Sequence, residues 1–177
     1  MKLVVLDRDG TINHDSDQYI KAPAEWRPIK GSLEAIARLT QAGWHVVVAT
    51  NQSGIARGLF DFATLNAIHQ TMHAAVLQAG GRIDAIFFCP HAADSDCECR
   101  KPKPGLLREI AHRMNVDLAT VPVIGDSLCD LQAAAAAGAR PILVLTGKGK
   151  KTRDGGGLPN GTRVFADLAA AALQLAP

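Results

Sequence analysis

The sequence predicts a doubly wound α/β fold with one parallel, Rossmann-like sheet, on three observations. Runs that are almost continuously apolar, such as residues 2–6, are typical of strands covered on both faces. Segments of helical period separate these runs, and parallel strands require crossover connections of this kind. The 177 residues, of which 47% are hydrophobic, suit one domain with a sizeable core. We therefore expect a single domain over residues 1–177.

The first half of the chain alternates strands and helices. Gly31 and Ser32 open a helix after a polar, turn-rich stretch, and Gly43 is placed to close it. Asp61 is a suitable N-cap for a longer amphipathic helix. The elements expected in this half are strands at 2–6, 44–49 and 83–88 and helices at 31–43 and 61–80.

The second half continues the alternation. Pro104 stands at the first turn of a predicted helix, where its missing N–H costs nothing. Residues 148–160 combine a basic run with three successive glycines and few apolar side chains, so they are predicted to form a mobile, solvated loop. The elements expected here are helices at 104–114, 128–137 and 168–175, strands at 121–124 and 141–145, and a short edge strand at 163–165.

Composition argues against two classes of partner. The 19 Lys and Arg residues against 17 Asp and Glu leave a net charge of +2, which creates no strong field toward nucleic acid or an acidic membrane. No run of about 18 apolar residues could span a bilayer, and the N-terminal apolar run is too short for a signal peptide. We expect a soluble, cytoplasmic protein.

Chemically active side chains follow the predicted strands. Asp7 and Asp9 come after the first strand, Thr50 after the second, and Asp126 and Asp130 after the fourth. The carboxyl ends of parallel strands open into one crevice, so these groups should meet there. Carboxylates gathered in a crevice require a cation, and Mg²⁺ suits carboxylates combined with a phosphate. The pattern predicts a magnesium site.

The same residues suit phosphoryl transfer. A carboxylate such as Asp7, directly after a strand, can attack phosphorus and form an aspartyl phosphate. Asp9, two residues on, returns to the same side of the extended chain and can exchange protons with the leaving group and with water. The hydroxyl of Thr50 and a lysine ammonium can stabilise the charge that spreads over the phosphoryl oxygens.

Three cysteines and one histidine predict a second metal site. Cys89, His91, Cys97 and Cys99 form a C-x-H-x5-C-x-C pattern within eleven residues. Three thiolates and an imidazole complete the tetrahedral shell of Zn²⁺ and leave no open position, so the site would be structural. The loop lacks apolar residues between Ala93 and Lys103, and metal binding would supply the energy that orders it.

Four runs in this order resemble the motifs of the haloacid dehalogenase phosphatase superfamily, and the resemblance spans residues 1 to about 145. They are 7–13 (DRDGTIN), 50–54 (TNQSG), 99–105 (CRKPKPG) and 125–130 (GDSLCD). The resemblance implies that Asp7 is the nucleophile and Asp9 the general acid/base, with Asp130 behind the metal. It implies that Thr50 and Lys101 stabilise the phosphoryl group. Magnesium would be held by Asp7, the carbonyl of Asp9 and Asp126.

Within the superfamily the chain is most similar to the phosphatases that remove the 7-phosphate of D-glycero-D-manno-heptose 1,7-bisphosphate, in ADP-heptose and lipopolysaccharide core biosynthesis. Many of those relatives carry Lys where this chain has Ser127. The chain has no insertion large enough for a cap domain, so the loops at 11–30, 50–61 and 89–103 must shape the pocket. The residues predicted to contact a small sugar phosphate are Asp15, Tyr19, Asn51, Gln52, Ser53, Arg57 and Arg100.

Two of these residues carry a more specific expectation. Arg57 and Arg100 can bind the second phosphate of a bisphosphate through the bidentate geometry that lysine lacks. His69 and His73, four residues apart on a predicted helix, have no third ligand nearby and are predicted to be ordinary surface residues. We expect a monomer.

Three other functions share part of this pattern. Histidinol-phosphate phosphatases have the same catalytic residues, and only a comparison of substrates separates them. Polynucleotide 3′-phosphatases have similar motifs, but the small net charge and the absence of an aromatic, basic platform argue against them. A zinc module that binds nucleic acid or protein without catalysis would have no reason to place Asp7, Asp9 and Asp126 at separate strand ends.

Overall fold

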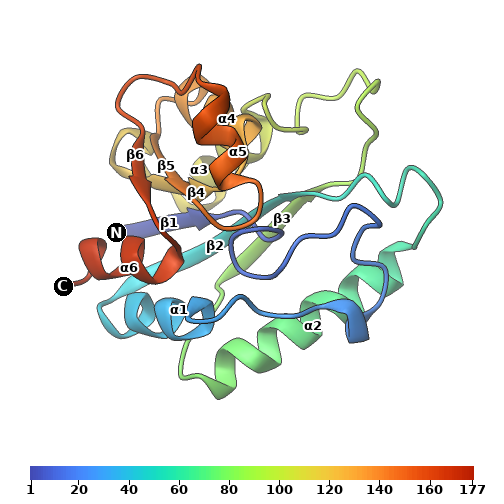
Figure 1. The fold of residues 1–177 in the computed structure, drawn as a ribbon, viewed down its shortest axis with the longest axis horizontal. Coiled ribbons are helices and arrows are strands. Elements are labelled where there is room, and N and C mark those ends of the chain that lie inside the picture. Colours follow the sequence, from blue (N-terminus) through green and yellow to red (C-terminus); the bar gives the residue numbers. More distant parts are fainter.

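The computed structural model describes residues 1–177 and is built on one six-stranded, fully parallel sheet (Figure 1). The strand order is β3-β2-β1-β4-β5-β6, and the direction of winding reverses between β1 and β4. This is the doubly wound arrangement that the sequence predicts, with a ligand crevice expected at the point of reversal. The strands are β1 (Lys2–Leu6), β2 (Trp44–Asn51), β3 (Ala85–Cys89), β4 (Pro122–Gly125), β5 (Arg140–Val144) and β6 (Arg163–Phe165).

Helices cover both faces of the sheet (Figure 1). One buried cluster joins the sheet to α1 (Ser32–Gln41), α2 (Phe62–Gln78) and α6 (Leu168–Leu175). A second cluster joins the opposite face to α3 (Gly105–Met114) and α4 (Leu128–Ala136). Right-handed crossovers place helices on both faces in this way, and a sheet covered on both sides needs apolar strands.

Strand β1 lies at the centre of the sheet, between β2 and β4. Its side chains alternate, so Val4 and Leu6 pack in the first cluster and Leu3 and Val5 in the second. All four are at most 2% exposed. The burial of β1 fixes the position of the residue that follows it, Asp7, at the centre of the carboxyl edge.

Local signals in the sequence account for several helix ends. The side chain of Asp61 accepts a hydrogen bond from the Thr64 N–H at the start of α2, as an N-cap does. Ser127 and Asp130 form a reciprocal capping box at the start of α4. Most predicted elements agree with the structure to within one or two residues, and α6 and β6 have the predicted bounds.

The prediction of a loop over 148–160 was wrong for its first half, where α5 (Gly149–Gly155) forms. Contacts distant in sequence hold this short helix. The Lys148 N–H donates to Asp126 Oδ2 at 2.7 Å, and Thr152 Oγ1 donates to the Asp126 carbonyl at 2.8 Å. Gly149 is buried against β5, where a Cβ atom would lie 1.8 Å from the Val144 carbonyl oxygen. Two further single turns are 3-10 helices at Pro23–Glu25 and Leu118–Thr120.

None of the helices combines the length and the apolar character that crossing a membrane requires.

Candidate active site

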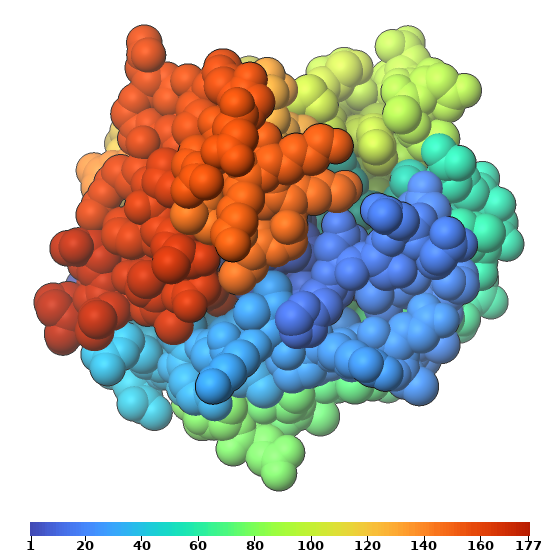
Figure 2. All heavy atoms as spheres, in the orientation of Figure 1, coloured from blue at the N-terminus to red at the C-terminus, as the bar shows by residue number.

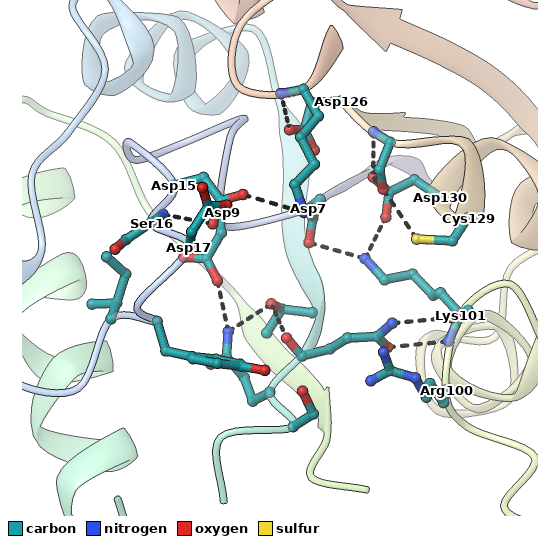
Figure 3. A pocket seen from close by; sticks show the side chains of 18 residues that line it. Asp7, Asp9, Asp15, Ser16, Asp17, Arg100, Lys101, Asp126, Cys129 and Asp130 are labelled. Atoms are coloured by element: carbon teal, nitrogen blue, oxygen red, sulfur yellow. Dashed lines mark hydrogen bonds and ion pairs between the residues drawn. The ribbon is translucent and has the colours of Figure 1, made fainter. Parts of the chain in front are cut away.

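A cavity of about 380 Å³ opens beyond the carboxyl ends of β1, β2 and β4. Figure 2 shows the surface hollowed where the blue N-terminal loop, the yellow-green segment near residue 100 and the orange segment near residue 148 approach one another. The wall is mostly polar, with 3 hydrophobic residues among 18 (Figure 3). The three loops expected to shape the pocket do line it, and Lys148 adds a fourth wall.

Three carboxylates and one ammonium group form the floor of the cavity. Carboxylate oxygens of Asp7, Asp126 and Asp130 all lie within 4.8 Å of one another. Lys101 Nζ donates to Asp7 Oδ1 at 2.9 Å, to Asp130 Oδ1 at 2.6 Å and to the Ala49 carbonyl at 2.8 Å. All three hydrogens of this buried ammonium are therefore used by the protein.

The floor carries more negative charge than Lys101 can balance. Burial, together with the charges of Asp130 and Asp126, raises the pKa of Asp7 well above its usual value, although Lys101 opposes the change. Burial and the Asp130 charge raise the pKa of Asp126 to about 7. Raised carboxyl pKa values at one point mark a place where a cation is favourable. The hard oxygen donors suit Mg²⁺.

Asp130 is already committed to protein partners, which leaves Asp7 and Asp126 to face a ligand. Asp130 Oδ1 accepts from Lys101, and Asp130 Oδ2 accepts from the Ser127 N–H at 3.1 Å and from Ser127 Oγ at 2.8 Å. Both oxygens of Asp130 are therefore used by the protein, and Asp130 orients Lys101. Ser127 thus holds Asp130 through its N–H and its hydroxyl.

Two glycines allow the backbone to close around Asp126. A Cβ on Gly10 would lie 2.0 Å from Asp126 Oδ2, and one on Gly147 would lie 2.3 Å from the same atom. Both glycines also have positive φ, at 86° and 54°. Thr146 Oγ1 donates to the Gly10 carbonyl at 2.6 Å and joins the two segments. The close packing fixes the Asp126 carboxylate at the point where β1 and β4 end.

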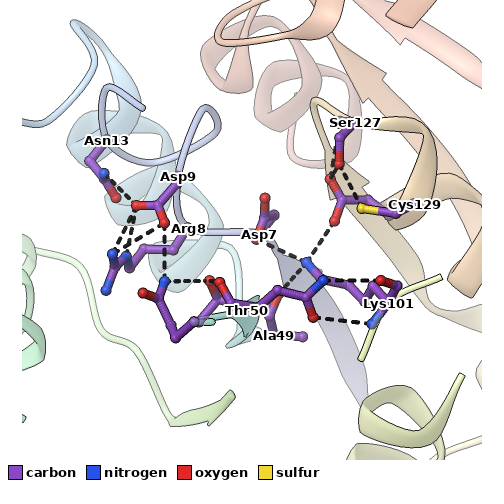
Figure 4. A network of polar contacts seen from close by, with 12 residues as sticks. Asp7, Arg8, Asp9, Asn13, Ala49, Thr50, Lys101, Ser127 and Cys129 are labelled. Carbon is purple, nitrogen blue, oxygen red and sulfur yellow. Dashed lines mark hydrogen bonds and ion pairs between the residues drawn. The ribbon is translucent and has the colours of Figure 1, made fainter. Parts of the chain in front are cut away.

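Asp9 lies in a different environment from Asp7 (Figure 4). Its Oδ1 accepts from Arg8 Nε and from Asn13 Nδ2, both at 2.9 Å, and its Oδ2 accepts from Gln52 Nε2 at 3.0 Å and Arg8 Nη2 at 3.2 Å. Burial alone would raise the pKa of Asp9. The Arg8 charge and the hydrogen bonds from Asn13, Arg8 and Gln52 outweigh burial and lower it.

Residues at the end of β2 support the two sides of the site. Thr50 Oγ1 accepts from Gln52 Nε2 at 3.0 Å, and its own hydrogen makes only a long contact of 3.5 Å with the Asn51 carbonyl, so it can turn toward a ligand in the cavity. Asn51 pairs with the backbone of Lys101: its Nδ2 donates to the Lys101 carbonyl at 3.0 Å, and its Oδ1 accepts from the Lys101 N–H at 3.1 Å. This pairing ties the lysine loop to the sheet.

Most of the predicted substrate contacts line the cavity, and one does not. Asp15, Tyr19, Asn51, Gln52, Ser53 and Arg100 are lining residues, together with the catalytic candidates Asp7, Asp9, Thr50, Lys101 and Asp126. Arg57 lies outside, with its guanidinium over the Tyr19 ring at 5.8 Å from the centroid. Two of the lining residues form an ion pair, with Lys148 Nζ 3.6 Å from Asp15 Oδ2.

The predicted zinc ligands meet in one cluster. Ligand atoms of Cys89, His91, Cys97 and Cys99 lie within 4.8 Å of one another. His91 Nδ1 is 3.4 Å from Cys89 Sγ and 3.3 Å from Cys99 Sγ. The cluster adjoins the cavity, because Arg100 and Lys101 follow Cys99 directly and both line the wall.

Electrostatics in this cluster favour a bound cation. Desolvation opposes ionisation of Cys97, but the Arg100 backbone N–H and the neighbouring thiols lower the pKa of Cys97 to about 6. Burial and contact with Cys89 raise the pKa of Cys99 to about 12. The protein alone thus favours one thiolate and disfavours a second beside it. Three thiols and an imidazole are the donor set of a closed zinc site.

Sequence patterns did not predict that Arg8, His69 and Lys148 belong to the site. The prediction that His69 is a surface residue was wrong: it is 6% exposed, and its Nε2 lies 3.1 Å from Arg8 Nη1. A signal existed, because His69 lies four residues after Leu65 and next to Ile68, on the apolar stripe of α2. His73 is only half-buried.

Fold and site together define a hydrolase of the haloacid dehalogenase type, and comparison with known proteins agrees. The HAD-hydrolase-like family matches residues 98–171. D-glycero-beta-D-manno-heptose-1,7-bisphosphate 7-phosphatase of Bordetella bronchiseptica is 66% identical over 175 residues, covering 99% of this chain and 98% of the relative. The chain therefore belongs to the family of heptose-1,7-bisphosphate 7-phosphatases within the haloacid dehalogenase-like hydrolases.

Two solved structures support this assignment. The D,D-heptose 1,7-bisphosphate phosphatase of B. bronchiseptica, complexed with magnesium and phosphate, superposes with a TM-score of 0.98 at 66% identity, covering 99% of this chain and 98% of the other. The corresponding phosphatase of Burkholderia thailandensis superposes with a TM-score of 0.80 at 58% identity, with the same coverage. The predicted fold class and superfamily are confirmed.

Lys101→Met should destabilise the protein by about 3 to 5 kcal/mol at neutral pH, because it leaves buried carboxylates without their cation. Urea unfolding measures the loss. A raised carboxyl pKa means that the folded protein takes up a proton before the unfolded chain does, so the deficit should shrink at acid pH. Lys21→Met, which removes a surface pair with Glu25, should cost about 1 kcal/mol or less. An equal loss of unfolding free energy in the two variants would contradict the role of Lys101 as the cation that neutralises the buried carboxylates.

Proposed function

We propose that this chain hydrolyses the 7-phosphate of D-glycero-D-manno-heptose 1,7-bisphosphate, a step in the formation of ADP-heptose for the lipopolysaccharide core. One observation carries the chemistry: β1 and β4 bring Asp7 and Asp126 together on the floor of a polar cavity, with Lys101 Nζ 2.9 Å from Asp7. The substrate follows from the family, whose B. bronchiseptica relatives carry this activity in their names.

Asp7 acts as the nucleophile in the first half of the reaction. Lys101 holds Asp7 Oδ1, and no protein group donates to Asp7 Oδ2, so this second oxygen attacks phosphorus. The bond between phosphorus and the sugar oxygen breaks as the aspartyl phosphate forms. Asp9 gives its proton to the leaving sugar oxygen, and the Thr50 hydroxyl and Lys101 stabilise the phosphoryl charge.

The second half returns the enzyme to its starting state. Asp9, now ionised, takes a proton from water as the water oxygen attacks phosphorus. The bond between phosphorus and Asp7 then breaks, which releases inorganic phosphate and the free carboxylate. Mg²⁺ held by Asp7, the carbonyl of Asp9 and Asp126 would supply positive charge for the phosphoryl oxygens.

The cysteine and histidine cluster has a structural role in this proposal. Cys89, His91, Cys97 and Cys99 would hold Zn²⁺, which would order the loop that leads into Arg100 and Lys101. The Lys101 ammonium must reach Asp7 and Asp130 from this loop, so an ordered loop would keep the charge balance of the site.

Arg100 is the residue proposed to bind the distal phosphate. It lines the cavity beside Lys101, and the lysine is fully engaged with the floor. A guanidinium can bind a phosphate through two parallel hydrogen bonds. Arg57 was predicted for the same task, but its position over Tyr19 makes it a support for the wall.

Asp7→Asn should lower phosphate release from heptose bisphosphate by about a thousandfold or more, since the amide cannot attack phosphorus. The exposed Asp154→Asn is the matched control and should retain activity. Acid quench during turnover should trap phosphate on the wild type and none on Asp7→Asn. Substantial release by the variant, or a higher kcat/KM for histidinol phosphate than for the heptose in the wild type, would contradict the proposal.

Removal of zinc should loosen residues 89–103 and lower turnover even with saturating Mg²⁺, because Lys101 loses its fixed position. Metal analysis, proteolysis of this segment and phosphate release measure the effect. Cys97→Ser should lose bound zinc and Cys129→Ser, outside the cluster, should keep it. Full turnover by protein that metal analysis shows to be free of zinc would contradict the role.

Arg100→Ala should raise the KM for the bisphosphate by about tenfold and leave the KM for a heptose 7-monophosphate nearly unchanged, because only the former has a distal phosphate. Arg57→Ala, which removes the same side chain outside the cavity, should not discriminate between the two substrates. Steady-state kinetics on both substrates provide the comparison. Equal effects of Arg100→Ala on the two KM values would rule out the assignment.

A further inference from the structure

A buried arginine and histidine lie behind the proposed acid/base residue. Arg8 is 0% exposed and stands between Asp7 and Asp9 in sequence, with its side chain reaching away from the cavity. It holds Asp9 through Nε and Nη2, and its Nη1 lies 3.1 Å from Nε2 of His69 on α2. Helix α2 is thus connected to Asp9 through the guanidinium of Arg8.

The chemistry of the two side chains fixes the direction of this contact. A guanidinium only donates hydrogen bonds, so His69 Nε2 must be the acceptor and the imidazole is neutral, with its proton on Nδ1. Burial and the Arg8 charge lower the pKa of His69 to about 3, in agreement with that tautomer. His69 is therefore a neutral acceptor near neutral pH.

The groups that donate hydrogen bonds to Asp9 lie on two sides of its carboxylate: Arg8 and Asn13 on the side away from the cavity, and Gln52 on the side that faces it. Arg8 and Asn13 are each 0% exposed, and neither lines the cavity. Gln52, which donates to Asp9 Oδ2, does line it. Two donors on each oxygen fill the lone pairs of the carboxylate, so a proton can reach Asp9 only where a donor withdraws. Gln52 is the donor that an entering substrate meets.

We propose that His69, acting through Arg8, is a positioning residue that anchors the rear of the Asp9 carboxylate and makes Oδ2 the oxygen that exchanges protons with substrate. This inference rests on the proposed phosphatase chemistry and extends it to a residue that touches no substrate. The anchor keeps the carboxylate plane fixed while the contact between Gln52 and Oδ2 opens and closes.

The leaving group provides the test. In the first half of the reaction, a misplaced general acid slows release of a sugar alkoxide, which needs a proton, but hardly affects p-nitrophenolate, which leaves without one. The second half uses Asp9 as a base and is the same for both substrates, so the single-turnover rate of leaving-group release isolates the first half. His69→Leu removes the acceptor and His69→Gln retains one in its side-chain carbonyl. His73→Leu makes the same exchange one turn further along α2 and is the control.

His69→Leu should lower the single-turnover rate of sugar release from heptose bisphosphate by about tenfold or more, with KM changed by less than about twofold. Its single-turnover rate of p-nitrophenolate release from p-nitrophenyl phosphate should stay within about twofold of the wild type. His69→Gln should recover most of the loss, and His73→Leu should resemble the wild type on both substrates. Equal losses on the two substrates, no loss, or identical behaviour of the Leu and Gln variants would overturn the inference.

A variant that does not fold and a wild type without activity are distinguished from a failure of the inference as follows. If circular dichroism shows that His69→Leu does not fold, Arg8→Lys takes its place, because an ammonium cannot hold Asp9 and His69 through a planar fork. It should show the same selective loss on the sugar substrate, and a uniform loss would overturn the inference. A wild type that releases no phosphate from either substrate would overturn the proposed function, whereas an active wild type with unselective variants overturns only the role of His69.

Discussion

The structure depends on holding three carboxylates close together, two of them bonded to one ammonium group, where the winding of the sheet reverses. Like charges this close are costly in a buried place, and Lys101 offsets only part of that cost. Burial of β1 and β4 on both faces sets where Asp7 and Asp126 stand, and the Asn51 pairing sets where Lys101 stands. The remaining negative charge makes the floor a favourable place for a cation, and a cation held there would in turn attract a phosphate.

The close packing around Asp126 has a consequence for the C-terminal third of the chain. Gly10 and Gly147 have no room for a side chain against this carboxylate, and Lys148 and Thr152 bond to the same residue. Helix α5 is therefore organised by a residue of the site rather than by an apolar core. Because Asp126 holds the segment that supplies Lys148 to the cavity wall, this small polar cavity is bounded without a cap domain.

The features that depend on local sequence patterns could be predicted from the sequence. Apolar runs and caps such as Asp61 gave the sheet and most helices, and polar residues at strand ends gave Asp7, Thr50 and Asp126. The sequence was insufficient where a contact between distant segments decides the outcome. Helix α5 forms through bonds to Asp126. The apolar stripe of α2 includes His69, but only the fold shows that its partner is Arg8. No period or spacing encodes either partner.

Asp7 and Asp9 illustrate how one strand end supports two roles. The fold alone raises the pKa of the nucleophile, which must be ionised to attack, and lowers the pKa of the acid, which must carry a proton. Both directions oppose the chemistry. A cation beside Asp7 lowers the pKa of Asp7, and a phosphate dianion near Asp9 raises the pKa of Asp9. Each ligand brings the charge that reverses the shift. The ligands therefore shift the pKa values of both carboxylates in the directions that the reaction requires.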